Sequence, residues 1–162
     1  MHINKMVKTT TMAAVFTASA ALGMADTLRW ASKTDPDTMD PHAGSSAPVL
    51  SFLNNVYEGL VRRGRDMSIG PSLATSWEPL VGDNGWRFTL REGVVFHNGA
   101  KFDAKDVLFS YNRASDEASD VRSWFAPVKE VRVIDEYTVD FVTKVPNPLF
   151  PDSIANFMIL DK

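Results

Sequence analysis

The chain of 162 residues contains no cysteine and carries 17 Lys and Arg against 20 Asp and Glu, a formal net charge of -3 at pH 7. The absence of cysteine excludes disulfide bonds, thiolate nucleophiles and zinc sites built on cysteine. The acidic balance argues against nucleic acid or an anionic membrane surface as the main partner, because both bind clustered positive charge.

The N-terminus has the three parts of a secretory signal peptide. Lys5 and Lys8 supply positive charge, residues 12–22 are apolar or small, and small side chains lead up to Ala25. This order predicts cleavage after Ala25. A helix over 12–22 would rise only about 16 Å, so we expect no stable insertion in a bilayer core of about 30 Å. Without a cysteine at the cleavage site, no lipid anchor is expected.

The next segments predict one strand, one helix and a second short strand. Residues 27–31 alternate apolar and polar side chains, which is typical of a strand. A turn-rich loop follows at 32–46. Apolar residues then recur at helical spacing over 47–58, with Ser46 as the expected cap of that helix. Residues 60–63 are expected to continue as a strand.

Two hairpins and a second helix follow. Residues 76–91 alternate around a Gly-Asp-Asn-Gly turn, and residues 128–142 alternate around Asp135-Glu136. Both patterns are typical of antiparallel strand pairs. Between them, Asp103 is expected to cap a helix with one apolar face. Helices mixed with hairpins predict an α+β domain with a small mixed or mostly antiparallel sheet.

Signals for catalysis or metal binding are weak. His42 and His97 each adjoin a turn and have no carboxylates at ligand spacing, so we predict surface or turn histidines. Asp35, Asp37 and Asp40 are spaced like the start of a calcium loop that lacks its required glycine and glutamate. No phosphate-binding glycine loop or nucleophile motif occurs. We therefore expect a non-enzyme without metal or cofactor.

The four tryptophans divide into two groups. Trp30, Trp77 and Trp86 lie within alternating segments and are expected to be in the core. Trp124 follows a polar break, outside any periodic element. An aromatic side chain on a loop is a candidate for ligand contact, and a side chain that covers the edge of the core is the alternative.

Five blocks of the chain resemble, in order, the bacterial extracellular solute-binding proteins of family 5, the peptide- and nickel-type binding proteins of ABC importers. The resemblance covers residues 27–162. The blocks are Asp-Pro-His at 40–42, Tyr-Glu-Gly-Leu-Val at 57–61, Leu-Ala-Thr-Ser-Trp-Glu at 73–78, the run from Trp86 to Gly99, and the run from Phe102 to Ser110.

The resemblance implies the N-terminal part of a type II periplasmic-binding-protein-like fold, in which two lobes close on a solute. After the signal peptide at 1–25, it implies the first strand and loop of the ligand-binding N-terminal lobe at 26–46. Residues 47–162 would be most of an extra domain inserted in that lobe, with the remainder of both lobes missing. The apolar run at 157–160 is then expected to be exposed and to promote aggregation.

The resemblance also implies a function. It predicts the substrate-binding component of an ABC importer, a periplasmic monomer that captures a peptide or other small solute for membrane permease subunits. The residues implied to contact the solute are Ser45, Ser46 and Ala47, which follow the Asp-Pro-His motif, and Trp124. Two alternatives stay open at this point: an exported hydrolase with its catalytic residues in unseen sequence, and a stand-alone secreted interaction domain.

Overall fold

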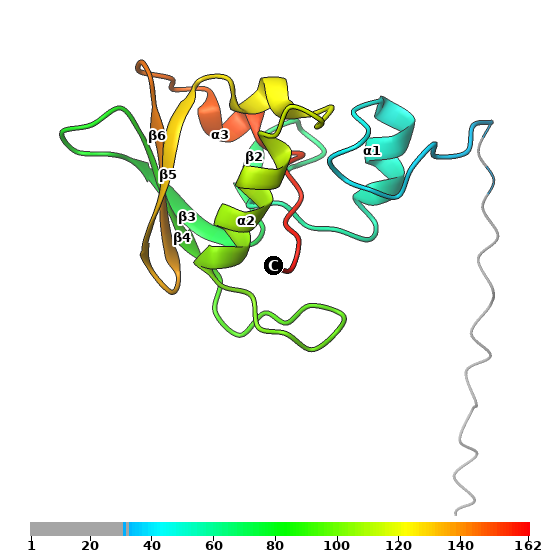
Figure 1. Ribbon diagram of the computed structural model, residues 1–162, viewed down its shortest axis with the longest axis horizontal. Helices are drawn as coiled ribbons and strands as arrows, with labels where there is room; N and C mark the ends of the chain where they lie inside the picture. Colours follow the sequence, from blue (N-terminus) through cyan, green and yellow to red (C-terminus); the bar gives the residue numbers. More distant parts are fainter. Residues whose placement is uncertain (1–30, 32) are drawn as a thin grey trace, which may run out of the picture. The chain divides into compact units, whose positions relative to one another are not determined.

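The computed structural model describes residue 31 and residues 33–162. The expected signal peptide, Trp30 and most of the expected strand at 27–31 lie outside the described residues. Within residues 33–162, helices alternate with antiparallel strand pairs (Figure 1), which confirms the α+β class. No helix among the described residues has the length and apolarity to cross a membrane.

A four-stranded antiparallel sheet forms the centre of this fold. Its strands lie in the order β3-β4-β6-β5. Their bounds are Ala74–Pro79 for β3, Gly85–Leu90 for β4, Val128–Asp135 for β5 and Thr138–Thr143 for β6. Both hairpins predicted from the sequence are therefore confirmed, and β4 and β6 join them into one sheet.

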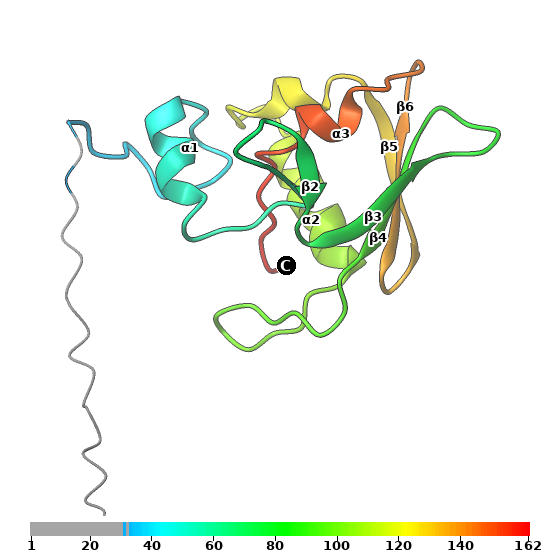
Figure 2. The same cartoon turned by 180° about the vertical axis from the view of Figure 1, so that it is seen from behind.

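Helix α2, Ala104–Ala114, packs against the apolar face of the sheet (Figures 1 and 2). Phe88 of β4 and Phe141 of β6 are fully buried there, with their rings edge to face at 5.5 Å. Trp77 and Trp86, expected in the core, pack against it and are half-buried.

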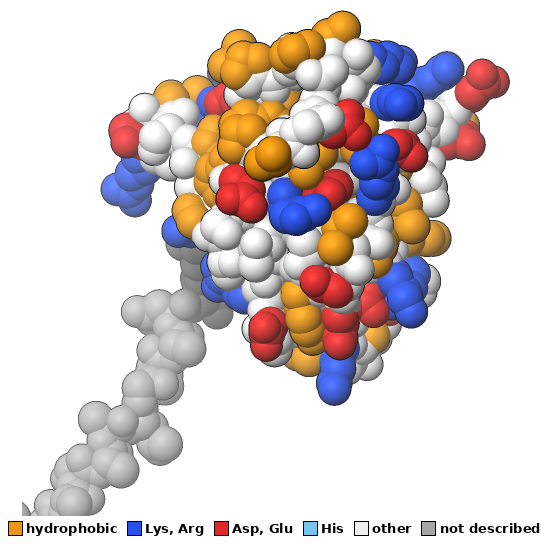
Figure 3. All heavy atoms as spheres, turned by 90° about the vertical axis from the view of Figure 1, so that its left-hand side faces the viewer, with side chains coloured by type: hydrophobic (Ala, Val, Ile, Leu, Met, Phe, Trp, Pro, Cys, Tyr) orange, Lys and Arg blue, Asp and Glu red, His pale blue; other side chains and the backbone are white. Residues whose placement is uncertain are grey.

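The opposite face of the sheet carries a row of charges of alternating sign. Backbone register places Glu78, Arg87, Asp140 and Arg132 next to one another across all four strands. The Arg87 guanidinium donates to both Asp140 oxygens, at 2.7 and 2.8 Å. Figure 3 shows Lys, Arg, Asp and Glu side chains interspersed on this side of the molecule. An antiparallel sheet with one polar face commonly leaves that face to solvent.

Asp103 caps the N-terminus of α2, as the sequence predicts. The Asp103 carboxylate accepts from the backbone N–H of Lys105 at 2.6 Å, and the Asp106 carboxylate accepts from the backbone N–H of Asp103 at 2.8 Å. This reciprocal arrangement satisfies backbone donors that have no partner within the helix.

The first helix is shorter than predicted. Helix α1 spans Ala47–Leu53, and a turn follows where the sequence pattern continued to residue 58. Asn54 and Asn55 account for the difference, because their side-chain amides donate to carbonyls four residues earlier, at 2.8 and 2.9 Å. Such bonds compete with helix continuation. Ser46 is the N-cap residue by position, but its side chain makes no cap hydrogen bond.

These two caps give a matched test of local stability. We expect Asp103→Ala to lower the free energy of unfolding by about 1 kcal/mol, because a backbone donor loses its acceptor. Ser46→Ala is expected to change it by less than about 0.3 kcal/mol, since no cap bond is lost. Urea titrations of both variants measure the difference, and equal effects would contradict it.

A two-stranded sheet lies beside the main one. Strand β1, Val61–Arg63, is present as predicted and pairs with β2, Ile69–Pro71. The sequence did not predict β2, which contains a glycine and a proline and shows no apolar alternation. Between β4 and α2, Val95 and Lys101 form a single isolated antiparallel bridge.

The expectation of an exposed apolar run at the end of the chain is wrong. In the C-terminal segment, residues 157–162, Phe157 and Ile159 belong to the main core and Met158 packs on α1. All three are at most 3% exposed. The Ile159 N–H donates to the Glu58 carbonyl at 2.9 Å, so backbone pairing holds this segment on one side.

Two polar residues of α2 bond the C-terminal segment on its other side. The Ser110 hydroxyl accepts from the backbone N–H of Leu160 at 2.8 Å. The buried Asp106 carboxylate accepts from the Lys162 ammonium at 3.1 Å. Apolar periodicity in α2 does not identify these contacts, because polar side chains make them with residues 50 or more positions away.

Candidate functional site

The residues implied to contact a solute, Ser45, Ser46 and Ala47, lie where an irregular loop enters α1. All three are exposed. The Ser46 side chain makes no cap hydrogen bond, and its neighbours Ser45 and Ala47 have small side chains. We call residues 40–47 the His42 loop.

Trp124 lies in a short 3-10 helix, η1 (Arg122–Phe125), and not in a loop as expected. Its indole is half-buried against the main core. This position fits the alternative that Trp124 covers the edge of the core. The rest of the indole stays exposed, so ligand contact remains a prediction.

His42 connects the His42 loop to the 116–120 turn, which precedes η1. The His42 carbonyl accepts from the backbone N–H of Asp120 and from the hydroxyl of Ser119, both at 3.1 Å. The imidazole Nε2 lies 3.0 Å from the carbonyl oxygen of Met158. The ring also stacks on Phe157, with centroids 6.0 Å apart. One residue thus joins three segments that are distant in sequence.

His42 and His97 both lie in turns, as predicted, but only His97 is at the surface. His42 is 3% exposed, and its preceding proline is also buried, so the Asp-Pro-His turn packs inward. His97 is exposed. Local sequence does not separate the two, because the partners of His42 lie more than 70 residues away.

An ion pair fixes the start of the His42 loop to the last turn of α2. The Arg113 guanidinium donates to both oxygens of the Asp40 carboxylate, one at 2.7 Å. Arg113 thereby lowers the pKa of Asp40 to about 2. Asp40 also accepts from the backbone N–H of His42 at 3.0 Å. Burial of the imidazole lowers the pKa of His42 below its ordinary value.

This ion pair predicts an acid-labile contribution to stability. Because the Asp40 pKa in the folded chain lies below its ordinary 3.8, the unfolded chain binds the proton more readily, and stability falls as pH decreases from about 4 to about 2. Both side chains are about one third exposed, so solvent reduces the contribution to about 1 kcal/mol. Urea unfolding should show Asp40→Asn less stable than wild type by that amount at pH 7 and by well under half of that amount near pH 2.

A matched ion pair is the control for that measurement. Arg63 and Asp152 also form an ion pair at 3.0 Å, with the Asp152 side chain 47% exposed. Asp152→Asn is expected to change the free energy of unfolding by less than about 0.5 kcal/mol at pH 7. A constant difference between Asp40→Asn and wild type from pH 7 to pH 2 would contradict the assigned role of Asp40.

Several hollows lie in the described part of the chain near these segments, and two of them bear on the site. One of about 320 Å³ is bordered by Asp40, His42, Arg113, Asp116 and Ser119, among others. Most of the residues that line it are polar or charged. Among the described residues, no group of three or more His, Asp or Glu side chains is placed to hold a metal ion.

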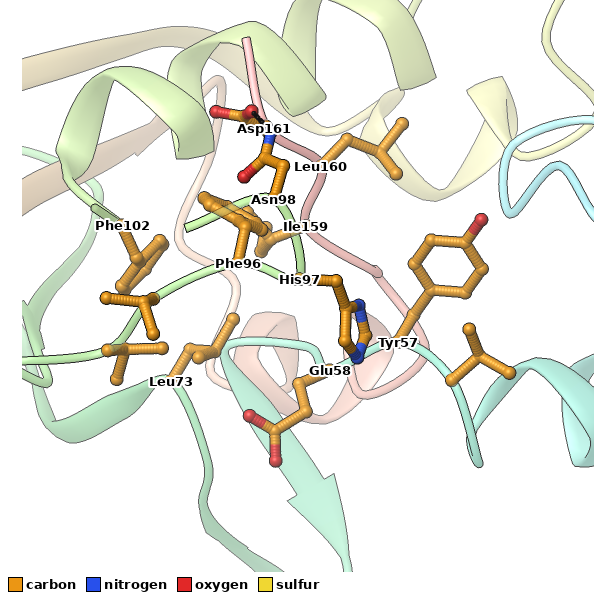
Figure 4. Close-up of a pocket in the computed structure, with 13 residues that line it drawn as sticks. Tyr57, Glu58, Leu73, Phe96, His97, Asn98, Phe102, Ile159, Leu160 and Asp161 are labelled. Carbon is orange, nitrogen blue, oxygen red and sulfur yellow. Dashed lines mark hydrogen bonds between the residues drawn. The ribbon is translucent and has the colours of Figure 1, made fainter. Parts of the chain in front are cut away.

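The other hollow, of about 420 Å³, is more apolar and contains none of the predicted contact residues. In Figure 4, Phe96 and Phe102 lie on one side of it and Tyr57 on the other. The polar groups at its edge are Glu58, His97, Asn98 and Asp161. Its volume is within the range of small-molecule pockets. In the sequence, residues 94–99 belong only to a block of the family resemblance, so they do not predict this hollow.

One protein-family model matches more than half of the chain. The model described as "Bacterial extracellular solute-binding proteins, family 5 Middle" matches residues 68–161. Among curated proteins, the periplasmic murein peptide-binding protein MppA of Escherichia coli (strain K12) is 34% identical over 61 residues, which cover 37% of this chain and 11% of MppA.

Solved structures of this kind match most of the described fold. NikZ from Campylobacter jejuni, in complex with Ni(L-His), superposes with a TM-score of 0.70 at 27% identity, over 79% of this chain and 26% of NikZ. OppA of Burkholderia pseudomallei superposes with a TM-score of 0.72 at 26% identity, over 77% of this chain and 28% of OppA. The chain thus spans little more than a quarter of these two relatives.

Proposed function

We propose, since the chain belongs to the bacterial extracellular solute-binding proteins of family 5, that it is part of the substrate-binding component of an ABC importer. The match of the family over residues 68–161 carries this proposal. The relatives that the chain matches are solute-binding proteins and not enzymes. The proposed solute is peptide-like, and the proposed partners are the permease subunits of the importer.

The proposed organisation follows the same membership. Residues 1–25 would direct export to the periplasm and be removed after Ala25. Residues 26–46 would be the first strand and loop of the ligand-binding N-terminal lobe, and residues 47–162 an extra domain of that lobe. The intact protein would act as a monomer.

Binding in such a protein makes and breaks no covalent bond. Two lobes close on the solute, burial supplies affinity, and a few placed polar groups supply specificity. We assign Ser45, Ser46 and Ala47 to backbone contact with the solute, which their exposure and small size support. The exposed part of the Trp124 indole would give an apolar contact on the neighbouring segment.

Thermal shift on the intact protein tests the function. The panel holds di-, tri- and tetrapeptides and the nickel–histidine complex, each at about one hundred times its expected Kd. A bound solute at that concentration stabilises the protein by about 2.7 kcal/mol, a rise of several degrees in Tm. A peptide should give this rise. No rise with any member would contradict the proposal, and a rise with nickel–histidine alone would contradict the solute class.

A pair of serine variants tests the assigned residues. Ser46→Trp places a large side chain at the proposed solute contact and is expected to weaken binding of the panel's best peptide at least tenfold. Ser76→Trp makes the same change at an exposed position of β3, remote in sequence, and should leave affinity unchanged. Isothermal titration calorimetry measures both. Equal affinities for the two variants would remove Ser46 from the site.

A further inference from the structure

The His42 imidazole has one ring nitrogen bonded and one without a partner. A carbonyl oxygen accepts, so the ring must donate from Nε2 to Met158, and the neutral ring then carries its lone pair on Nδ1. Nδ1 is buried and has no hydrogen-bond partner among the described residues. Buried polar atoms without a partner are uncommon, so this nitrogen requires an explanation.

A proton on Nδ1 would be poorly accommodated in the folded chain. It would add an N–H donor where no acceptor is present, and a positive charge where the ring is shielded from water. Arg113 of α2 already places a positive charge near the ring. Asp40 would favour the proton, but its carboxylate is engaged by Arg113.

The other segments around the ring contribute no charge that would make a protonated His42 favourable in the folded chain. Phe157 and Met158 contribute an aromatic ring and a carbonyl. The 116–120 turn contributes its backbone and the Ser119 hydroxyl, while Asp116 borders the polar hollow beside the ring. Proton uptake on His42 is therefore expected to favour states in which the His42 loop has separated from these segments.

From this geometry we propose that His42 is a positioning residue that holds Ser45, Ser46 and Ala47 in place for solute, and that its protonation in mild acid releases the His42 loop. Neutral His42 ties the loop to the 116–120 turn and to the C-terminal segment. Protonation of His42 in acid releases the loop from these two segments and does not change the solute-contacting side chains themselves. The inference rests on the proposed function only in its last step, the effect on solute binding.

Hydrogen exchange on the intact protein without solute tests the release. The opening constant of amides at 40–47, corrected for intrinsic exchange, should rise about tenfold from pH 7.5 to pH 5.5, because the open loop takes up a proton with an ordinary histidine pKa. A rise of less than twofold would overturn the proposal.

Two glutamine variants assign that rise to one ring. His42→Gln keeps an N–H for the Met158 carbonyl but does not titrate, so its opening constant should not change with pH. His97→Gln removes the exposed histidine and should keep the wild-type rise. A wild-type rise in His42→Gln, or its loss in His97→Gln, would overturn the proposal.

A titration of the His42 imidazole in the wild-type protein tests the proposal even if His42→Gln does not fold. Nitrogen chemical shifts should show His42 protonated on Nε2 at pH 7.5 and titrating at lower pH than the histidine of a short unstructured peptide. Titration of His42 at the same pH as that peptide would overturn the proposal.

The affinity for the panel's best peptide gives the last readout. It should fall about tenfold between pH 7.5 and pH 5.5 in wild type and stay constant in His42→Gln. Release of the loop without any fall in affinity would overturn the positioning role. Failure of the proposed function looks different, since then no solute binds to wild type even at pH 7.5.

Discussion

Replacing Gly85 by alanine is expected to lower the free energy of unfolding by about 4 kcal/mol and Tm by more than about 10 °C. Gly85 begins β4 at a φ of 136°, and a Cβ there would lie 2.1 Å from the Phe141 carbonyl oxygen and 2.9 Å from the Val142 Cα. Both atoms belong to the neighbouring strand's backbone. The central pairing of β4 with β6 must therefore move apart to accept a methyl group.

Gly82, in the same hairpin turn, is the matched control. Its φ is also positive, at 81°, but a Cβ there meets nothing within 4 Å. Gly82→Ala should cost only about 1 kcal/mol, the strain of a left-handed backbone. Calorimetric melting of both variants separates the two causes. Equal losses would show that strain alone, and not the approach of β6, makes glycine necessary at Gly85.

Phe157→Ala is expected to lower the free energy of unfolding by about 3 to 5 kcal/mol, the usual cost of removing a fully buried phenylalanine ring. Phe157 is 0% exposed, packs edge to face on Phe125 at 4.7 Å and stacks on His42. The variant should also increase hydrogen exchange at residues 40–43, because the His42 ring loses one of its supports. Urea unfolding measures the first effect.

Leu149→Ala provides the control for a large apolar side chain near the end of the chain. Leu149 is 71% exposed, so its loss should change stability by less than about 0.5 kcal/mol. If Phe157→Ala is as mild as Leu149→Ala, the C-terminal segment does not belong to the core of this fold.

Elements that depend on near neighbours could be predicted from the sequence. The two hairpins of the main sheet alternate in period two around turn residues, and Asp103 lies three residues before Asp106, so both patterns are complete within a short window. Strand β2 escaped prediction because three residues with a glycine and a proline have no alternation to detect. The length of α1 could not be predicted because the side-chain hydrogen bonds of two asparagines end the helix early.

Features that depend on distant partners could not be predicted locally. His42 looks like a turn histidine until Met158 and Ser119 are placed around it. Asp106 and Ser110 look like solvent-facing positions until the C-terminal segment supplies donors for them. For the candidate site, resemblance to a family identified Ser45, Ser46 and Ala47, and the structure adds their exposure. Solute contact by these residues stays a prediction.

The bond between His42 and Met158 closes a loop of 116 residues. Closing so long a chain segment costs entropy, and contacts of high sequence separation slow folding. The sheet and α2 should therefore form before the His42 loop docks. A surrounding lobe that already holds both ends of this segment close together would reduce that entropy cost. Attachment to such a lobe should then speed docking of the His42 loop.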